Sequence, residues 1–357
     1  PVVSTSVNYL VGSDEAPQGF PGMAPEQEHL MFRGSPGLSA DQLADIGGVM
    51  GGNFNADTRE SVTQYLFTVP AEDLDVALHI EAARMSDVLD TEKDWDQERG
   101  AIEQEVAQDL SNPSYMAYAK LRSVLFAGTT YEHDALGTRA SFDKTTGLML
   151  KLFHDRWYAP NNAILIVAGD VDPVATLGKV RQLFGPIPAK RLPRRPELKL
   201  GPSESRTISL KSDLPFGMQG IAVRMPGLDS PDYPAAELLA DVLSSHRGDL
   251  YGLVPQGKAL SAAFSLDSLP KAGIGYAMAA FPAGGDPKAV ERDLGAVLRK
   301  IVRDGVPPEL VAAAKTQERR QAEFEKNSIE GLASVWAEAV AVDGLDSPDE
   351  DLARIEK

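Results

Sequence analysis

The sequence predicts two copies of one fold that combines helices and strands. A length of 357 residues suits two domains. The stretch "IPAKRLPRRPELKLGPSES" has the prolines and alternating basic residues of an extended linker. On either side of it, "YLFTVPAEDLDVALHIEAARM" and "YAMAAFPAGGDPKAVERDLGAVL" each indicate a strand, a Pro-Ala turn and an amphipathic helix, and a second long helix follows each. We therefore predict a domain at 1–195, a linker at 196–204 and a related domain at 205–357. Two unrelated α+β domains are the alternative.

The elements of the first domain follow from local patterns. Residues 2–11 alternate in the manner of a strand. A helix is expected over 22–32, and a second begins where Ser39 and Gln42 fit a capping box. The segment "GGNFNADTRESVTQYLFTVP" begins with glycine and asparagine residues typical of a turn and continues with residues typical of β-strands. The other expected elements are helices at 74–88, about 92–110 and 174–184 and a buried strand at 163–167.

Composition excludes several functional classes. The formal net charge is −17, which disfavours non-specific binding to nucleic acid or anionic membranes and weakly favours basic or neutral substrates. The chain has no cysteine, so any zinc must be held by histidine and carboxylate. No apolar run of about 18 residues predicts a membrane span. No signal peptide is visible, but both ends look trimmed, so a bacterial periplasm and a cytoplasm both stay open. A nucleotide enzyme is disfavoured because "VAGDVDP" lacks a phosphate-binding glycine pattern.

Two carboxylates lie on one side of the helix predicted at about 92–110. Glu98 and Glu105 are seven positions apart, which separates them by only about 20° around a helix. An apolar stripe that includes Trp95 and Ile102 lies to one side, so both carboxylates border the buried face. Taken alone, such a pair is usually a solvated edge that is matched by a basic residue, and Arg99 is available for that role.

The stretch "MAPEQEHLMFRG" nearly contains a zinc motif. Two histidines four positions apart share one face of a helix and can hold one metal ion, and a glutamate between them can activate a bound water in the pattern H-x-x-E-H. Glu28 and His29 fit this pattern, but Pro25 stands where the first histidine belongs. A catalytic zinc also needs a third protein ligand, which Glu105 could supply. The alternative is ordinary helix-start chemistry, with a proline and acidic residues in the first turn.

Several blocks in order resemble the pitrilysin/insulinase family of zinc peptidases, the relatives of mitochondrial processing peptidase. These blocks are "VGSDEAPQGFPGMA", "EHLMFRGS", "GGNFNADTRESVTQY", "ERGAIEQE" and "WYAPNNAILIVAGDVDP". The resemblance covers residues 1 to about 190 strongly, and the second half by element order. It implies an α+β fold of two related domains, each a mostly antiparallel β-sheet packed with α-helices, the second truncated at its C-terminal end.

The resemblance also implies roles for individual residues. His29 and Glu105 match zinc ligands, and Glu28 matches the general base. Glu98 matches a supporting carboxylate. Asn55 and Ala56 match an edge strand that pairs with the backbone of a peptide substrate. The implied function is a zinc metalloendopeptidase subunit that acts on peptides or unfolded segments, and a non-catalytic partner subunit is the alternative.

Two departures put the activity of this chain in doubt. The first is Pro25, which cannot donate a lone pair to a metal. The second lies in the later domain, where related peptidases carry an Arg and a Tyr seven positions apart. The corresponding places here look like Val254 and Ser261. A homologous partner subunit would then supply the Arg/Tyr pair.

Three interpretations of Pro25 remain open at this stage. In the first, the chain is the metal-bearing type of subunit and Pro25, natural or introduced, disables or weakens it. In the second, the chain is a non-catalytic family member. In the third, zinc still binds through His29, Glu105 and another donor. The first is favoured, because Glu28, His29, Glu98 and Glu105 all keep their spacing.

Overall fold

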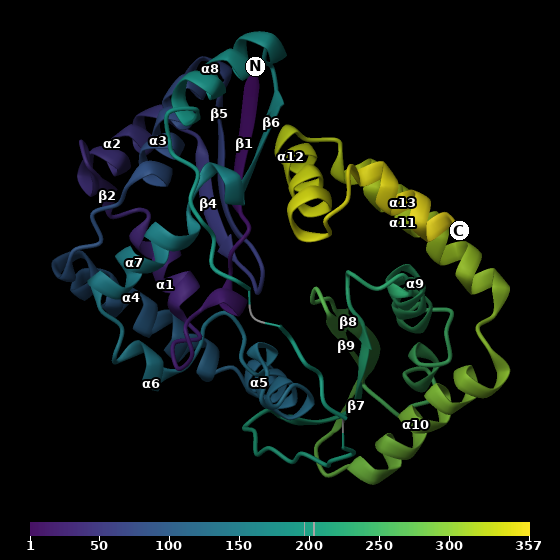
Figure 1. The fold of residues 1–357 in the computed structure, drawn as a ribbon. Helices are drawn as coiled ribbons and strands as arrows, with labels where there is room; N and C mark the ends of the chain where they lie inside the picture. The colour runs from purple at the N-terminus through teal and green to yellow at the C-terminus, as the bar shows by residue number, and fades with distance from the viewer. Residues whose placement is uncertain (196, 203) are drawn as a thin grey trace. The chain divides into compact units, whose positions relative to one another are not determined.

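The computed structural model describes residues 1–195, 197–202 and 204–357 and divides the chain into two compact units (Figure 1). The first unit comprises Pro1–Pro202 and Glu325–Pro348, and the second comprises Ser203–Phe324 and Asp349–Lys357. The strands of the first unit are β1 (Val2–Tyr9), β2 (Gly34–Ser35), β3 (Leu38–Ser39), β4 (Asn53–Thr58), β5 (Thr63–Pro70) and β6 (Ala163–Gly169). Its α-helices are α1 (Met23–Leu30), α2 (Ala40–Met50), α3 (Leu74–Ser86), α4 (Glu92–Leu110), α5 (Pro113–Leu125), α6 (Arg139–Phe142), α7 (Gly147–Trp157), α8 (Pro173–Phe184) and α12 (Ile329–Ala337).

The sheet of the first unit is antiparallel throughout, with the strand order β4-β5-β1-β6. β1 is central and almost wholly buried, and Val3, Val7 and Tyr9 point into the core. β4 pairs with β5 along one side only, so it forms an edge of the sheet as the described residues build it.

Helices cover the sheet of the first unit from several parts of the chain. α3 contacts β1 and β5, and α1 contacts β4. α12 comes from the far end of the sequence and packs on β1 and β6, with Ala333 and Ala337 buried (Figure 1). A π-helical turn, η6 (Glu338–Val342), follows it directly. The segment 325–348 therefore belongs to the first unit, although the predicted second domain included it.

The turn between β4 and β5 connects several elements of the first unit. Thr58 Oγ1 donates to Glu28 Oε2 of α1 at 2.5 Å, Arg59 Nη1 donates to both oxygens of Glu338 at 2.8 and 2.9 Å, and Glu60 accepts from Arg122 of α5 at 2.7 Å. Gly12 lies so close beneath the turn that a Cβ there would meet the carbonyl oxygen of Arg59 at 2.1 Å. Only glycine fits at that position.

The second unit contains a smaller antiparallel sheet of the order β7-β9-β8. Its elements are β7 (Phe216–Pro226), α9 (Tyr233–Ser244), β8 (Ser261–Asp267), β9 (Ala272–Pro282), α10 (Pro287–Asp304), α11 (Pro308–Glu325) and α13 (Pro348–Glu356). Its core joins apolar residues of β8 and β9, such as Phe264 and Phe281, to Leu294 of α10. α13 is tied to α11, where Arg319 pairs with Glu356 at 2.9 Å.

The α+β fold with antiparallel sheets is confirmed, and the recurring strand–helix order appears in both units. The predicted linker at 196–204 includes positions 196 and 203, which lie outside the described residues; its other residues have no helix or strand. The helix expected over 22–32 is shorter, Met23–Leu30, because the chain turns after it toward β2. Among the described residues, no helix has the length and apolarity needed to cross a membrane.

Candidate functional site

The site is built on α1, which begins at Met23 after Gly22. Pro25 lies in the first turn, where backbone N–H groups have no partner within the helix, so the proline costs no helical hydrogen bond. Met23, Ala24 and Leu30 are buried and anchor the helix in the core. α1 contacts α4 and α7 on one side and β4 on another, so it positions its side chains between α4 and the sheet edge.

His29 lies between the two carboxylates of α4. Its Nδ1 is 3.0 Å from Glu98 Oε1, and its Nε2 is 3.5 Å from Glu105 Oε2. Glu98 is buried, whereas Glu105 is half exposed. The structure therefore brings together three residues that the motifs place on two separate helices.

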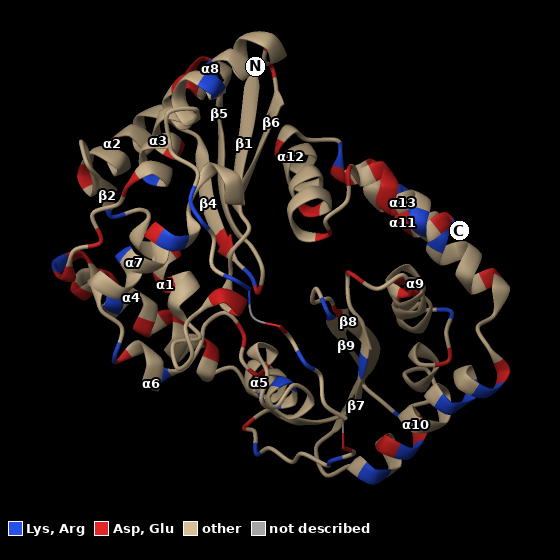
Figure 2. Cartoon of the chain, viewed as in Figure 1, with Lys and Arg blue, Asp and Glu red and all other residues tan. Residues whose placement is uncertain are grey.

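Within this cluster, opposite charges stabilise the ionised forms of His29 and Glu98. Burial opposes the charged form of His29, but its hydrogen bond to the Glu98 carboxylate and the nearby carboxylates of Glu28 and Glu105 raise the His29 pKa overall. The hydrogen bond with His29, assisted by Arg33, lowers the pKa of Glu98. Arg33 also forms an ion pair with the second oxygen of Glu98. Acidic residues recur along α4, which Figure 2 marks in red, so a positive charge is stabilised beside it.

Glu28 faces the end of β4 rather than His29's carboxylate partners. Thr58 donates to it, and burial raises the pKa of Glu28 despite that bond. Arg33 and Thr58 are contacts that sequence reasoning missed, although both lie inside the quoted blocks "EHLMFRGS" and "GGNFNADTRESVTQY". Arg99, the alternative partner for the α4 carboxylates, instead contacts Glu103 and Asp143.

Asn55 and Ala56 lie in β4, opposite Leu66 and Tyr65 of β5. The strand is largely exposed, and its outer side is unpaired among the described residues. Phe54 is 45% exposed and lies near Phe32 and Phe67, with ring centroids 6.2 and 6.0 Å apart respectively. An extended backbone can therefore add to β4 within reach of an apolar surface.

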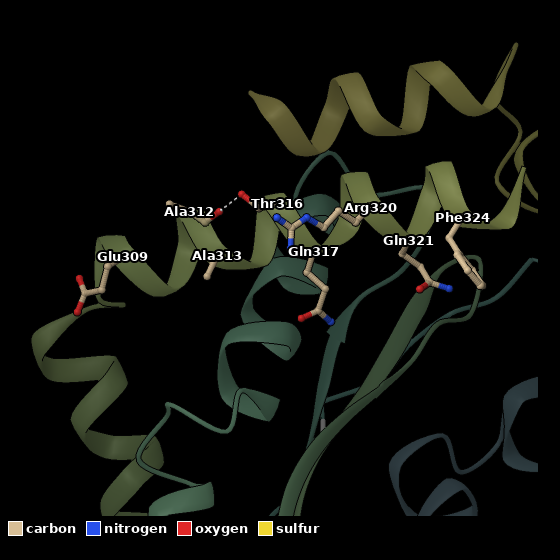
Figure 3. A pocket seen from close by; sticks show the side chains of 8 residues that line it. All are labelled: Glu309, Ala312, Ala313, Thr316, Gln317, Arg320, Gln321 and Phe324. Carbon is tan, nitrogen blue, oxygen red and sulfur yellow. Dashed lines mark hydrogen bonds between the residues drawn. The ribbon is translucent and has the colours of Figure 1, made fainter. Parts of the chain in front are cut away.

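A separate hollow of about 740 Å³ lies in the second unit along one face of α11 (Figure 3). Its lining residues recur three or four positions apart: Glu309, Ala312, Ala313, Thr316, Gln317, Arg320, Gln321 and Phe324. Thr316 donates to the carbonyl oxygen of Ala312 at 2.8 Å, so its hydroxyl is used within the helix. This face lacks the histidine and paired carboxylates of the α1–α4 cluster.

Comparison with known proteins places the chain in a family. A model described as "Insulinase (Peptidase family M16)" matches residues 1–139, and one described as "Peptidase M16 inactive domain" matches residues 146–318. Together these two matches take up most of the chain. The chain belongs to the insulinase family of peptidases, family M16. It is a member that lacks the complete H-x-x-E-H motif, because Pro25 replaces the first histidine.

Several curated M16 relatives are named as zinc proteases. Zinc protease PqqE of Helicobacter pylori is 25% identical over 312 residues, which cover 84% of this chain and 69% of that protein. An uncharacterized zinc protease of Streptomyces coelicolor is 28% identical over 49% of this chain and 38% of its own length. Another, from Rickettsia felis, is 30% identical over 51% of this chain and 45% of its own length. The chain thus aligns with less than half of two of these three relatives.

Solved M16 structures share the fold. A protease from Helicobacter pylori has a TM-score of 0.89 at 21% identity and covers 99% of this chain and 88% of its own. A peptidase M16 inactive domain from Pseudomonas fluorescens has a TM-score of 0.87 at 15% identity, with coverage of 100% of this chain and 86% of its own. These similarities confirm the two-domain α+β architecture.

The residues present do not make a complete zinc site of the M16 kind. A catalytic zinc takes three protein ligands, and only His29 and Glu105 are placed as donors, while Pro25 has none. Among the described residues, no group of three His, Asp or Glu side chains is arranged to hold a metal ion. Glu98, another acid beside His29, is held by Arg33 and by Nδ1 of His29. We therefore derive no catalytic step through zinc.

The Arg/Tyr positions expected in the later domain fall in the second unit. Val254 follows the short helix η5 (Tyr251–Leu253), and Ser261 begins β8. Neither side chain can form a charged or phenolic contact with a peptide. The partner that would supply such a pair stays a hypothesis.

Proposed function

We propose that this M16 chain binds extended polypeptide segments along β4 and, with Pro25 in α1, does not hydrolyse them on its own. The observation that carries this proposal is the unpaired edge of β4 beside α1. Asn55 and Ala56 would offer the backbone groups, and Phe54 an apolar surface. Zinc, if taken up, would have only His29 and Glu105 as ligands from this site.

The chemistry around β4 favours a basic or neutral peptide. Asp57 and Glu105 are each 52% exposed in their side chains and lie on the elements that flank this edge. A homologous subunit is the proposed partner, since it would supply the Arg/Tyr pair that Val254 and Ser261 do not. The ferredoxin protease FusC, whose E83A mutant was solved in complex with Arabidopsis ferredoxin, has the same fold (TM-score 0.74, 17% identity). That complex supports a polypeptide as the ligand class.

A second candidate function is the metal-bearing peptidase subunit. It is favoured by the close approach of His29, Glu98 and Glu105, with Glu28 one residue away on α1. On this view the donor at position 25 is what the metal site lacks, and a partner subunit would supply the Arg/Tyr pair. The two candidates differ in what a histidine at that position would restore.

Peptide binding tests the first candidate. The probe is a labelled peptide of about a dozen alternating valine, threonine and lysine residues. We expect saturable binding and slower hydrogen exchange of amides in 53–58. A matched probe with N-methyl groups on alternate residues keeps the side chains but cannot pair as a strand. Equal binding of the two probes, or protection confined to other segments, would overturn the proposal.

A further inference from the structure

Residues 325–348 pack on the first unit, although residues of the second unit flank them on both sides. Within this stretch, α12 and η6 follow each other directly and form one helical segment over 329–342, the α12–η6 segment. α12 contacts β1 and β6, the two strands of the sheet that lie farthest from β4 (Figure 1). The segment therefore packs on the sheet that carries the proposed peptide-binding edge, at the opposite side of that sheet.

Apolar burial holds the α12–η6 segment only modestly. Its buried side chains are all alanines, namely Ala333, Ala337, Ala339 and Ala341, whereas Trp336 is 38% exposed. An alanine removes a single methyl group from water, so each contributes less than a buried valine or leucine would. A segment with few large buried side chains opens locally at low cost, and its polar contacts then matter for its order.

One charged side chain ties this segment to the edge strand. Arg59 Nη1 donates to both carboxylate oxygens of Glu338, the first residue of η6, at 2.8 and 2.9 Å. Arg59 Nε donates to Asp57 Oδ2 of β4, also at 2.8 Å. Because the donors of a guanidinium group have a fixed planar geometry, both carboxylates are held in defined directions. Arg59 therefore bridges β4 and the α12–η6 segment.

We propose that Arg59 couples the occupancy of β4 to the order of the α12–η6 segment. This inference rests on the proposed peptide binding at β4. A strand that pairs with β4 restricts the motion of Asp57 and of the β4–β5 turn, so less conformational freedom is lost when Arg59 binds Glu338. The bound strand thereby stabilises the α12–η6 segment. By linkage, an ordered α12–η6 segment tightens the binding of the strand by the same factor.

The exposure of the ion pair limits the size of this coupling. The side chains of Arg59 and Glu338 are 41% and 44% exposed. Water and dissolved ions compete for a pair of this kind, so it changes an equilibrium by only about two- to fivefold. An effect of that size is within the range that hydrogen exchange measures.

Hydrogen exchange of the 357-residue chain tests the coupling. The probe is the valine, threonine and lysine peptide with serine in place of lysine, so that no cation competes with Arg59 for Asp57. We expect protection at 53–58 and, over the same peptide concentrations, exchange in 338–342 that slows about two- to fivefold. Protection at 53–58 without a change in 338–342 would overturn the coupling and leave the proposed function standing. No protection at 53–58 would overturn both.

Two variants identify the residue that carries the effect. Glu338→Gln keeps the shape of the side chain but removes the charge that Arg59 binds. We expect this variant to bind the probe about two- to fivefold more weakly and, at saturation, to show protection at 53–58 with no change in 338–342. Glu330→Gln alters an exposed glutamate in the first turn of α12 and should respond as the parent chain does. An equal response of 338–342 in Glu338→Gln and in the parent would contradict the role of Arg59.

Discussion

At the scale of single residues, the α1–α4 cluster matches the predicted zinc site except that Pro25 stands in place of one donor. His29 touches Glu98 with one nitrogen and approaches Glu105 with the other, so both α4 carboxylates are already oriented toward it. Arg33 forms an ion pair with the other carboxylate oxygen of Glu98. A ligand set of this kind depends on every donor, and loss of even an outer hydrogen-bond partner typically costs about 10–100-fold in affinity.

The residue that decides metal binding is Pro25. Pro25→His should place an imidazole one turn before His29 and give zinc three protein ligands with Glu105. We expect the variant to copurify with zinc close to one ion per chain and to melt at a higher temperature with zinc than with chelator. The reason is that a ligand whose free concentration is about 100 times its dissociation constant stabilises the folded protein by about 2.7 kcal/mol.

Pro25→Ala is the matched control, since it removes the proline without adding a donor. It should bind no more zinc than the parent chain. Equal zinc content in the two variants would show that His29 and Glu105 are not ligands.

A buried carboxyl beneath α1 sets a pH dependence of stability. Burial raises the pKa of Asp90 to about 7, although Gln27 donates to it at 3.0 Å. The unfolded chain releases this proton near the ordinary aspartate pKa of about 4, whereas the folded chain keeps it to about pH 7. The folded state therefore loses stability as the pH rises from about 4 to about 7. Above about pH 7 this group causes no further loss of stability.

Asp90→Asn should remove this dependence, because asparagine mimics the protonated carboxyl. It also tolerates the positive φ of 40° at this position. We expect the variant to gain on the order of 4 kcal/mol over the parent at about pH 8 and only about 1.5 kcal/mol at about pH 5. Urea unfolding at the two pH values measures this. The same gain at both would mean that Asp90 does not titrate in this range.

At the scale of elements, the β4–β5 turn controls the edge strand. Three consecutive residues contact three different elements. Thr58 binds α1, Arg59 binds the π-helical turn η6, and Glu60 binds α5. The proposed peptide edge thus ends in a turn that several elements hold in place.

Arg59→Ala tests this connection. Arg59 and Glu338 are both partly exposed, so their pair should contribute only about 0.5–1 kcal/mol to global stability. Its local effect should be larger: amides in 338–342 are expected to exchange several-fold faster. Arg206→Ala, which removes an exposed pair with Glu204, is the control. Unchanged exchange in 338–342 would show that the pair does not hold this segment.

Local patterns predicted the elements because they depend on neighbours in the chain. The capping box at Ser39 and Gln42 is present, and the spacing of Glu98 and Glu105 does place both beside His29. The packing of α12 on β1 joins residues more than 300 positions apart, and no periodicity encodes such a contact. Arg33 and Thr58 were missed for a related reason, since a ligand motif specifies donors and not the side chains that hold them.

At the scale of the whole molecule, the charge balance should shape what binds. The net charge of −17 gives the surface a negative potential that attracts cationic peptides and weakens as salt is added. We expect the affinity of the lysine-bearing probe to fall several-fold between about 0.05 and 0.3 M salt, mainly through a slower association rate. A probe with serine in place of lysine should bind more weakly at low salt and change little over this range. If both probes respond equally to salt, the long-range charge of the molecule does not contribute to recognition and contacts along β4 alone must account for it.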